Sequence, residues 1–94
     1  MTTASALIIE TTDGRTSLFT GRVTIGQAGD FPVDDTHAST LHAVLWPGET
    51  GWLVSDLGSM NGTFLNGEKI YGPRWLSKGD TLRIGHTEIT VVPA

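Results

Sequence analysis

Apolar residues in this chain fall in short runs, and along much of the sequence they alternate with polar residues. Toward the C-terminal end, Leu82 and Ile84, and then Ile89 and Val91, alternate with polar neighbours. A period of two is typical of strands with one face in a core and the other in water. No window of ten or more residues shows the 3.6-residue period of an amphipathic helix, so we expect almost no helix. The runs rich in Thr, Val, Ile and aromatic residues predict strands at 7–11, 16–19, 23–25, 42–46, 52–55, 63–65, 68–70, 81–84 and 87–92.

Pairs of turn-forming residues separate these runs. Asp13-Gly14 and Asn66-Gly67 are the strongest signals, because both favour the positive φ angles of a two-residue hairpin. About ten short strands joined by turns at this spacing predict an all-β fold, a two-sheet β-sandwich rather than a barrel or propeller. Since 94 residues leave no room for a second core, we expect residues 1–94 to form one domain.

Composition and charge narrow the possible partners. Six Lys plus Arg against ten Asp plus Glu give a formal net charge of −4, which argues against nucleic acid or an anionic membrane surface as a partner. The chain has no cysteine, so a disulfide framework and a Cys-based zinc site are excluded, and a reducing compartment suits it. The start lacks the features of a signal peptide. We therefore expect a cytoplasmic protein, monomeric, with no cofactor.

Three loop fragments hold small or hydrogen-bonding residues where strands are predicted to end, at 25–27, 39–42 and 56–63. Ser39 offers a hydroxyl and a backbone N–H that could point at an anion, and the Asn61 amide could pair with an extended peptide backbone. Gly62 would let the chain turn sharply beside Asn61, and Gly26 would permit close approach of the Ser39 loop. Together these residues predict a peptide-binding rim in which the glycines are scaffold.

Catalytic and metal-binding interpretations of the same residues are weaker. Ser39, His42 and Asp56 could suggest a hydrolase triad, but no nucleophile elbow is present. His37, His42 and His86 lack any ligand spacing, so no metal site is expected. The sequence therefore favours a binding protein over an enzyme.

The three tryptophans, Trp46, Trp52 and Trp75, allow two interpretations. An exposed set could form a flat platform for a sugar, whereas buried rings would pack in the core. Trp52 begins an apolar run and Trp75 precedes Leu76, so we expect these two to be buried. Met60 differs, because a methionine at a loop tip gains little by burial there, and it could offer an apolar contact to a ligand.

The loop fragments resemble the pattern of the forkhead-associated (FHA) family over roughly residues 23–92. The resemblance rests on Ser39-x-x-His42, on Leu76-Ser77-Lys78-Gly79-Asp80 and Ile84-Gly85, and on the run Asp56-Leu57-Gly58-Ser59-Met60-Asn61-Gly62-Thr63-Phe64-Leu65-Asn66-Gly67. It implies an eleven-stranded β-sandwich of the FHA (SMAD/FHA-like) type. It also implies a protein-interaction module whose apical loops bind phosphothreonine in a partner protein.

Several positions depart from the family pattern. The phosphate-gripping Arg that follows the glycine in the family is replaced by Gln27, and Thr40 and Met60 stand where the family usually has other polar or charged residues. Ser39 and Asn61 are retained, and the resemblance assigns His42 to bracing the loops from within. The segment between Gly26 and Ser39 is also about two residues shorter than usual in the family.

These departures leave three hypotheses. The first is a phosphothreonine-peptide module with a degenerate phosphate pocket formed by Gln27, Ser39, Thr40, Met60 and Asn61, supported by Gly26, His42 and Gly62. The second is a phosphate-independent FHA-fold domain that binds a protein partner or serves as a scaffold. The third is a carbohydrate-binding β-sandwich.

Overall fold

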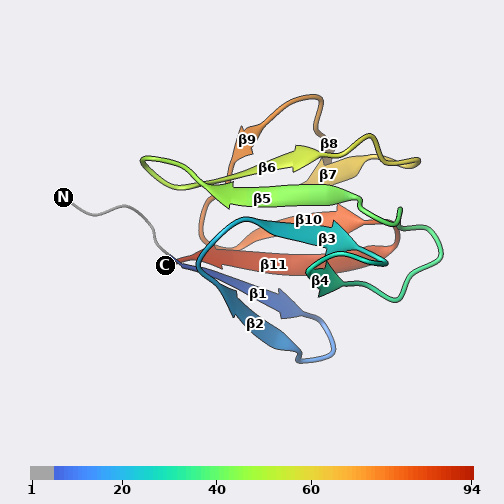
Figure 1. Cartoon of the computed structure of the whole chain (residues 1–94), viewed down its shortest axis with the longest axis horizontal. Helices are drawn as coiled ribbons and strands as arrows, with labels where there is room; N and C mark the ends of the chain where they lie inside the picture. Colours follow the sequence, from blue (N-terminus) through green and yellow to red (C-terminus); the bar gives the residue numbers. More distant parts are fainter. Residues whose placement is uncertain (1–5) are drawn as a thin grey trace.

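The computed structural model describes residues 6–94, and the strands in this part of the chain form two packed sheets (Figure 1). Between residues 6 and 94 no helix is present, and so none that could cross a membrane. The eleven strands are β1 (Leu7–Thr11), β2 (Thr16–Phe19), β3 (Val23–Gly26), β4 (Phe31–Pro32), β5 (Ala43–Pro47), β6 (Trp52–Asp56), β7 (Thr63–Leu65), β8 (Glu68–Lys69), β9 (Arg74–Trp75), β10 (Asp80–Ile84) and β11 (Thr87–Pro93).

One sheet has the strand order β2-β1-β11-β10-β7-β8, and the other has the order β4-β3-β5-β6-β9. Every pairing is antiparallel except that of β3 with β4, which is parallel. Each run of alternating residues that predicted a strand does form one, and the two-sheet sandwich is confirmed. The short strands β4 and β9 are additions that the pattern did not predict.

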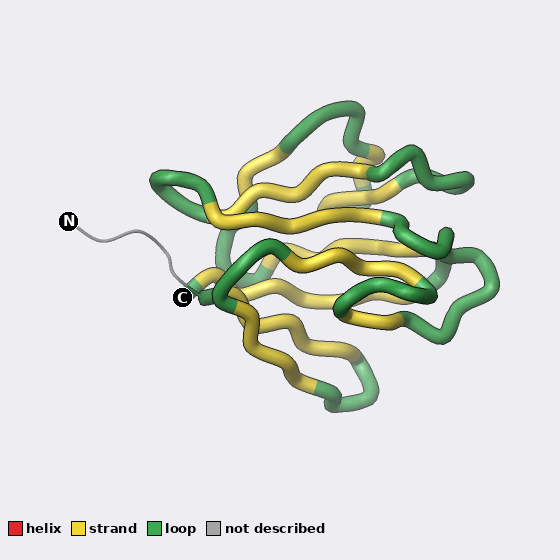
Figure 2. The backbone as a smooth tube through the Cα atoms, viewed as in Figure 1, coloured by secondary structure: helices red, strands yellow, loops and turns green. Residues whose placement is uncertain are grey.

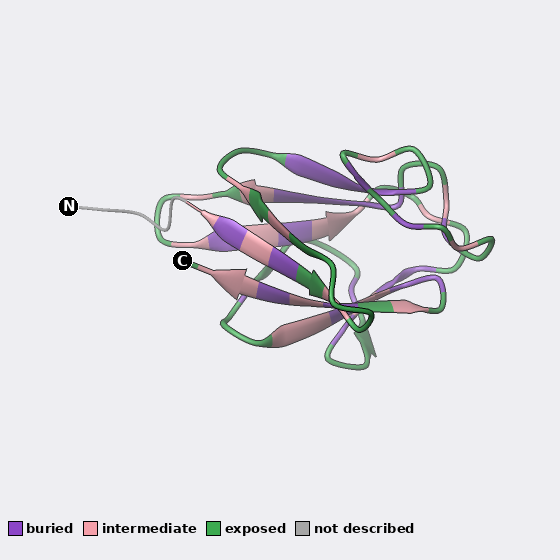
Figure 3. Ribbon diagram, turned by 90° about the horizontal axis from the view of Figure 1, so that it is seen from below, coloured by how far each residue is buried: buried purple, intermediate pink, exposed green. Residues whose placement is uncertain are grey.

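The core lies between the two sheets, and buried residues alternate with less buried ones along several strands, among them β1, β6 and β11 (Figure 3). Leu82, Ile84, Ile89 and Val91 are all buried, as the alternation predicted. Trp52 is fully buried at the start of β6. The prediction that Trp75 is buried is wrong.

Trp75 lies on β9, which is the edge strand of its sheet, and its side chain is 54% exposed. A Cβ added at Gly48 would lie 3.3 Å from the Trp75 ring, so the indole covers the β5–β6 turn instead of entering the core. With Trp52 buried and Trp75 at a sheet edge, the three tryptophans do not form one exposed platform.

Loops gather at the end of the sandwich opposite the C-terminus (Figures 1 and 2). They follow β3, precede β5, and connect β6 to β7 and β10 to β11. We call residues 27–30, 33–42, 57–62 and 85–86 the apical rim. Antiparallel pairing of β3 with β5 and of β5 with β6 brings the ends of these strands, and so the three predicted loop fragments, to this one rim.

Candidate peptide-binding site

Gly26 ends β3 where the backbone of the next loop passes directly over it. A Cβ at this position would lie 2.3 Å from the carbonyl oxygen of Thr40 and 2.8 Å from that of Ser39. The following residues bond to the same two carbonyls, with Gln27 N 3.1 Å from Ser39 O and Ala28 N 2.9 Å from Thr40 O. Any side chain at position 26 would force the backbone apart, so glycine fixes the position of the Ser39 loop.

His42 is fully buried and joins the two loops that carry Ser39 and Asn61. The Ser39 N–H donates to His42 Nδ1 over 3.0 Å, and His42 Nε2 lies 2.8 Å from the carbonyl oxygen of Gly62. Since Nδ1 accepts, the proton of the neutral ring is on Nε2, which donates to Gly62. The structure thus places His42 as a brace between residues 33–42 and 57–62.

Ser39 uses its backbone and side chain differently from the sequence-based prediction. Its N–H is donated to His42, so the expectation that this N–H points at an anion is wrong. The Ser39 Oγ accepts a hydrogen bond from Met60 N over 3.0 Å, and its own proton can still be donated at the rim. The serine therefore offers a ligand one hydroxyl donor.

Asn61 is exposed at the rim, next to the same loop. Its Nδ2 donates to the carbonyl oxygen of His37 over 2.9 Å. This bond uses one of the two N–H groups of the amide and fixes its orientation, while the amide still has an acceptor and a second donor. Such a pair is suited to the backbone of an extended peptide.

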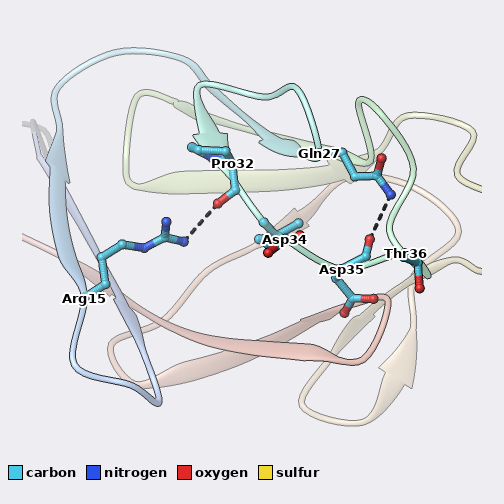
Figure 4. Close-up of a pocket in the computed structure, with 7 residues that line it drawn as sticks. Arg15, Gln27, Pro32, Asp34, Asp35 and Thr36 are labelled. Atoms are coloured by element: carbon cyan, nitrogen blue, oxygen red, sulfur yellow. Dashed lines mark hydrogen bonds between the residues drawn. The ribbon is translucent and has the colours of Figure 1, made fainter.

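Gln27 is committed to the loop that faces it (Figure 4). Its Nε2 lies 2.9 Å from the carbonyl oxygen of Asp35 and 2.9 Å from that of Ala38. Both N–H groups of the amide are therefore donated to backbone. Gln27 acts here as a brace for residues 35–38 and presents neither a cation nor a spare donor.

The remaining predicted contacts, Thr40 and Met60, are both exposed, and Met60 is 88% exposed. Leu41 and Leu57 in the same two loops are also exposed. The rim around Ser39 and Asn61 thus combines hydroxyl and amide groups with three exposed apolar side chains, those of Leu41, Leu57 and Met60.

Asp35 is a further important residue of the rim, which the sequence reasoning missed. Its carboxylate accepts hydrogen bonds from His37 N (2.8 Å), His86 N (2.8 Å) and the Thr87 hydroxyl (2.7 Å). Packing at this point is tight, because a Cβ at Gly85 would lie 2.8 Å from Ala38 N. Asp35 therefore fastens the loop before β5 to the β10–β11 turn. The Asp-x-His spacing allows a local Asx turn, but nothing in the sequence indicated the distant donors.

The hydrogen bond from Thr87, followed by that from the His37 N–H, lowers the pKa of Asp35 to about 2. A carboxyl whose pKa is lower in the folded state stabilises the fold above its unfolded pKa, and this stabilisation is lost as the pH falls from about 4 to about 2. We expect Asp35→Asn to unfold more easily than the wild type at pH 7, and the difference to shrink between pH 4 and pH 2. Urea denaturation across this range measures it. The adjacent exposed residue provides the control Asp34→Asn, and a pH-independent difference for Asp35→Asn would show that the carboxylate charge is not responsible.

Asp56 organises the β6–β7 loop. It accepts hydrogen bonds from the N–H and hydroxyl of Ser59 and from the Thr63 hydroxyl, and Ser59 Oγ in turn accepts from Gly62 N. Burial raises the pKa of Asp56, but the Ser59 and Thr63 hydroxyls outweigh it, so the pKa is lowered overall. With Asp56 committed to this loop and Nδ1 of His42 to the Ser39 backbone, these side chains do not assemble a hydrolase triad.

Gly62 and Asn61 are adjacent but have different roles, which a pair of variants can separate. Gly62 has φ +88°, and any residue with a side chain would strain the backbone at this angle, even where there is room for the side chain. We expect Gly62→Val to lower the free energy of unfolding by about 1–3 kcal/mol, and Asn61→Ala, which loses one exposed hydrogen bond, by less than about 1 kcal/mol. Thermal melts of the two variants provide the measurement. Equal melting temperatures would contradict this division into scaffold and contact.

A pocket beside the rim has a volume of about 420 Å³ and is lined by Arg15, Gln27, Pro32, Val33, Asp34, Asp35 and Thr36 (Figure 4). The Arg15 guanidinium donates to the Pro32 carbonyl over 2.9 Å and lies 4.3 Å from the centre of the Phe31 ring. Because two aspartates share this cavity with one arginine, its field does not favour an anion. Within residues 6–94, no group of three or more potential ligands is arranged to hold a metal ion.

Comparison with known proteins identifies the class of this fold and rim. The FHA domain family model matches residues 19–85, which is more than half of the chain. The chain belongs to the FHA family.

Among its relatives is the FHA domain-containing protein FhaB of Mycolicibacterium smegmatis, 42% identical over 73 residues, which cover 76% of this chain and 47% of FhaB. The chain covers 47% of the length of this FhaB and 54% of the length of FhaB from Mycobacterium tuberculosis.

Two solved structures are similar over nearly their whole length. One comes from a structural and functional analysis of phosphothreonine-dependent FHA domain interactions, with a TM-score of 0.84 and 32% identity over 93% of this chain and 95% of the other. The second is the FhaA FHA domain in complex with the intracellular domain of Rv3910. Its TM-score is 0.81, and it is 33% identical over 90% of this chain and 98% of the other. The fold, including its eleven strands, is therefore that of an FHA domain.

Proposed function

We propose that this domain binds an extended, threonine-containing segment of a partner protein at the apical rim, and that it recognises phosphate on that threonine only weakly. Family membership and the similarity to a domain with phosphothreonine-dependent interactions support the binding of a threonine-containing segment. Ser39 and Asn61, which lie on neighbouring loops of the rim, would hold the threonine and the peptide backbone. Thr40 and Met60 would contact the flanking residues.

The position of Gln27 is the observation that supports weak recognition of phosphate. An Arg at this place could offer phosphate a bidentate cationic fork, but Gln27 is neutral and donates both N–H groups to the carbonyls of Asp35 and Ala38. A hydrogen bond to a charged group contributes roughly 1.5–3 kcal/mol, against about 1 kcal/mol for a neutral one. Replacing a charged fork by an unavailable amide therefore weakens phosphate binding by about ten- to a hundredfold.

Nearby carboxylates reinforce this weakening. Asp34 and Asp35 line the cavity beside Gln27, and Asp30 lies in the β3–β4 loop, where it accepts hydrogen bonds from the N–H and hydroxyl of Thr24. A phosphothreonine carries a charge of about −1.5 to −2 at neutral pH, so these groups would repel it. They would repel an unphosphorylated threonine much less.

The exposed apolar side chains of the rim favour one alternative, which is binding that is independent of phosphate. Leu41, Leu57 and Met60 can bury apolar surface against a partner whether or not its threonine is phosphorylated. Carbohydrate binding is not favoured by any comparable feature, since Trp52 is buried in the core.

Backbone amide shifts during titration with a matched pair of threonine peptides, one phosphorylated and one not, test where the domain binds. We expect the largest shifts at Ser39, Thr40, Met60 and Asn61. Shifts concentrated on β9 and the β5–β6 turn, or no shifts with either peptide, would contradict the proposal.

A further inference from the structure

Four strands lie at the edges of the two sheets in the part of the chain that the structure describes, and β2 differs from the other three. β4, β8 and β9 each have only two residues, and each contains a proline or a charged residue. β2 has four residues, Thr-Ser-Leu-Phe, with no charge and no proline, and Figure 1 shows it at the outer margin of the molecule. Short length, charge and proline commonly keep an edge strand from pairing with another chain, and β2 has none of them.

The outer edge of β2 has backbone groups that no strand within residues 6–94 pairs with. On the inner edge, the N–H of Thr11 donates to the carbonyl oxygen of Arg15 over 2.9 Å, in line with the β1–β2 register. Successive residues of an antiparallel strand direct their backbone groups to opposite edges, so Ser17, like Arg15, bonds to β1. The N–H and C=O groups of Thr16 and Leu18 therefore point to the free edge.

Leu18 adds an apolar surface to this edge. Its side chain is 61% exposed, on the face of the sheet that points away from the core. Ile8 lies opposite Leu18 on β1, and Val92 lies opposite Ile8 on β11. Both are only partly buried, so the three side chains form an apolar row across the outer face that ends at the free edge.

The charges at the two ends of β2 are complementary to those of a second copy. Asp13 lies in the turn before β2, Arg22 follows the end of β2, and both are exposed. Antiparallel pairing of two β2 strands around Ser17 would place the start of each strand beside the end of the other, and so Asp13 of each copy beside Arg22 of the other. Among residues 6–94, Arg22 forms no ion pair, so its charge is available for this contact.

We propose that the β2 edge pairs with the β2 edge of a second copy of this domain, in an antiparallel dimer with twofold symmetry. Thr16 of one copy would lie opposite Leu18 of the other, and each such pair exchanges both of its N–H···O bonds. The two Leu18 side chains would be diagonal neighbours, which joins the two apolar rows into one. Composition predicted a monomer, but composition does not show which strand lies at the edge of a sheet.

The dimer would have its two apical rims at opposite ends. Antiparallel pairing reverses the strand direction in the second copy, and each rim lies at one end of its own sandwich (Figure 1). Such a dimer would join two partner molecules, one at each rim. A four-residue edge buries less than the roughly 1,200 Å² of a stable interface, so we expect a weak dimer whose population depends on protein concentration.

Sedimentation velocity of the unmodified chain, without any peptide, measures this association and is independent of the proposed function. We expect the sedimentation coefficient to increase as the protein concentration is raised from about 10 μM to about 500 μM. Leu18→Lys should raise the dissociation constant at least about tenfold, because it places two like charges at the centre of the edge. Tyr71→Lys, at a position 87% exposed in the β8–β9 loop, is the matched control and should leave it unchanged. A monomer at the highest concentration, or equal weakening by both lysines, would overturn the proposal.

Charge reversal tests the direction and register of the pairing. Asp13→Lys and Arg22→Glu should each raise the dissociation constant about 3-fold or more, and the double variant should recover most of the loss. A double variant that associates no better than the single variants would contradict antiparallel pairing around Ser17.

Amide hydrogen exchange locates the interface. The amides of Thr16 and Leu18 should exchange more slowly as the concentration increases, whereas those of Ser17 and Phe19, which already face β1, should change little. Protection of Thr16 and Leu18 that does not depend on concentration would contradict the proposal, because it would show that the edge is covered within one chain.

Discussion

His42→Ala should lower the free energy of unfolding by about 3 kcal/mol, the largest loss expected from a single side chain of the rim. The substitution leaves a cavity where a fully buried ring was, and removes the partners of the Ser39 N–H and the Gly62 carbonyl. A buried polar group left unpaired costs about 1–3 kcal/mol, and the cavity adds to it. Urea denaturation measures the change.

The same variant should also loosen the rim selectively. Amide exchange should quicken in residues 33–42 and 57–62 more than in the paired strands β1 and β11, because the buried His42 side chain bonds to both loops. Tyr71→Ala, at a position 87% exposed, is the control and should cost little. A loss below about 1 kcal/mol for His42→Ala would show that the loops are positioned by other contacts.

Gln27→Arg should increase the affinity for a phosphorylated threonine peptide by about 5- to 30-fold. A guanidinium has five N–H donors, so it can bond to the Asp35 and Ala38 carbonyls and still direct a charge toward a phosphate near the Ser39 hydroxyl. The gain is limited because Asp34 and Asp35 remain, and it should decrease as salt is added. The unphosphorylated peptide should gain nothing.

Gln27→Met separates the effect of losing the two hydrogen bonds of Gln27 from the effect of gaining a positive charge. It removes both brace hydrogen bonds without adding a charge, so it should not increase phosphate-dependent affinity. If Gln27→Arg folds normally and also gives no phosphate-dependent gain, one substitution does not restore the pocket, and phosphate-independent binding becomes the better interpretation.

Sequence patterns predicted the longer strands well because alternation and β-branched residues record which face of a strand is buried. They did not predict β4 or β9, since two residues are too few to show a period. Trp75 was wrongly assigned to the core because its apolar character was visible in the sequence, whereas its position at a sheet edge depends on strand order.

The contents of the rim were predictable from its loop fragments, but the hydrogen bonds within it were not. The Asp35 carboxylate bonds to His86 and Thr87, which lie 51 and 52 residues away in the sequence, and the Gln27 amide bonds to backbone carbonyls. Neither type of contact leaves a spacing that can be recognised. The sequence showed that Gln27 lacks a charge, but only the three-dimensional arrangement shows that its donors are already used.

The central claim is that the rim binds a threonine segment while recognising phosphate only weakly. The ratio of the dissociation constants of an unphosphorylated and a phosphorylated peptide tests this claim most directly. Isothermal titration of the wild-type domain with matched phosphorylated and unphosphorylated threonine peptides yields two dissociation constants. The account predicts measurable binding of the phosphorylated peptide and a preference for it of no more than about tenfold. A preference above about a hundredfold would contradict the account, because it would show that phosphate is strongly bound without an arginine at position 27.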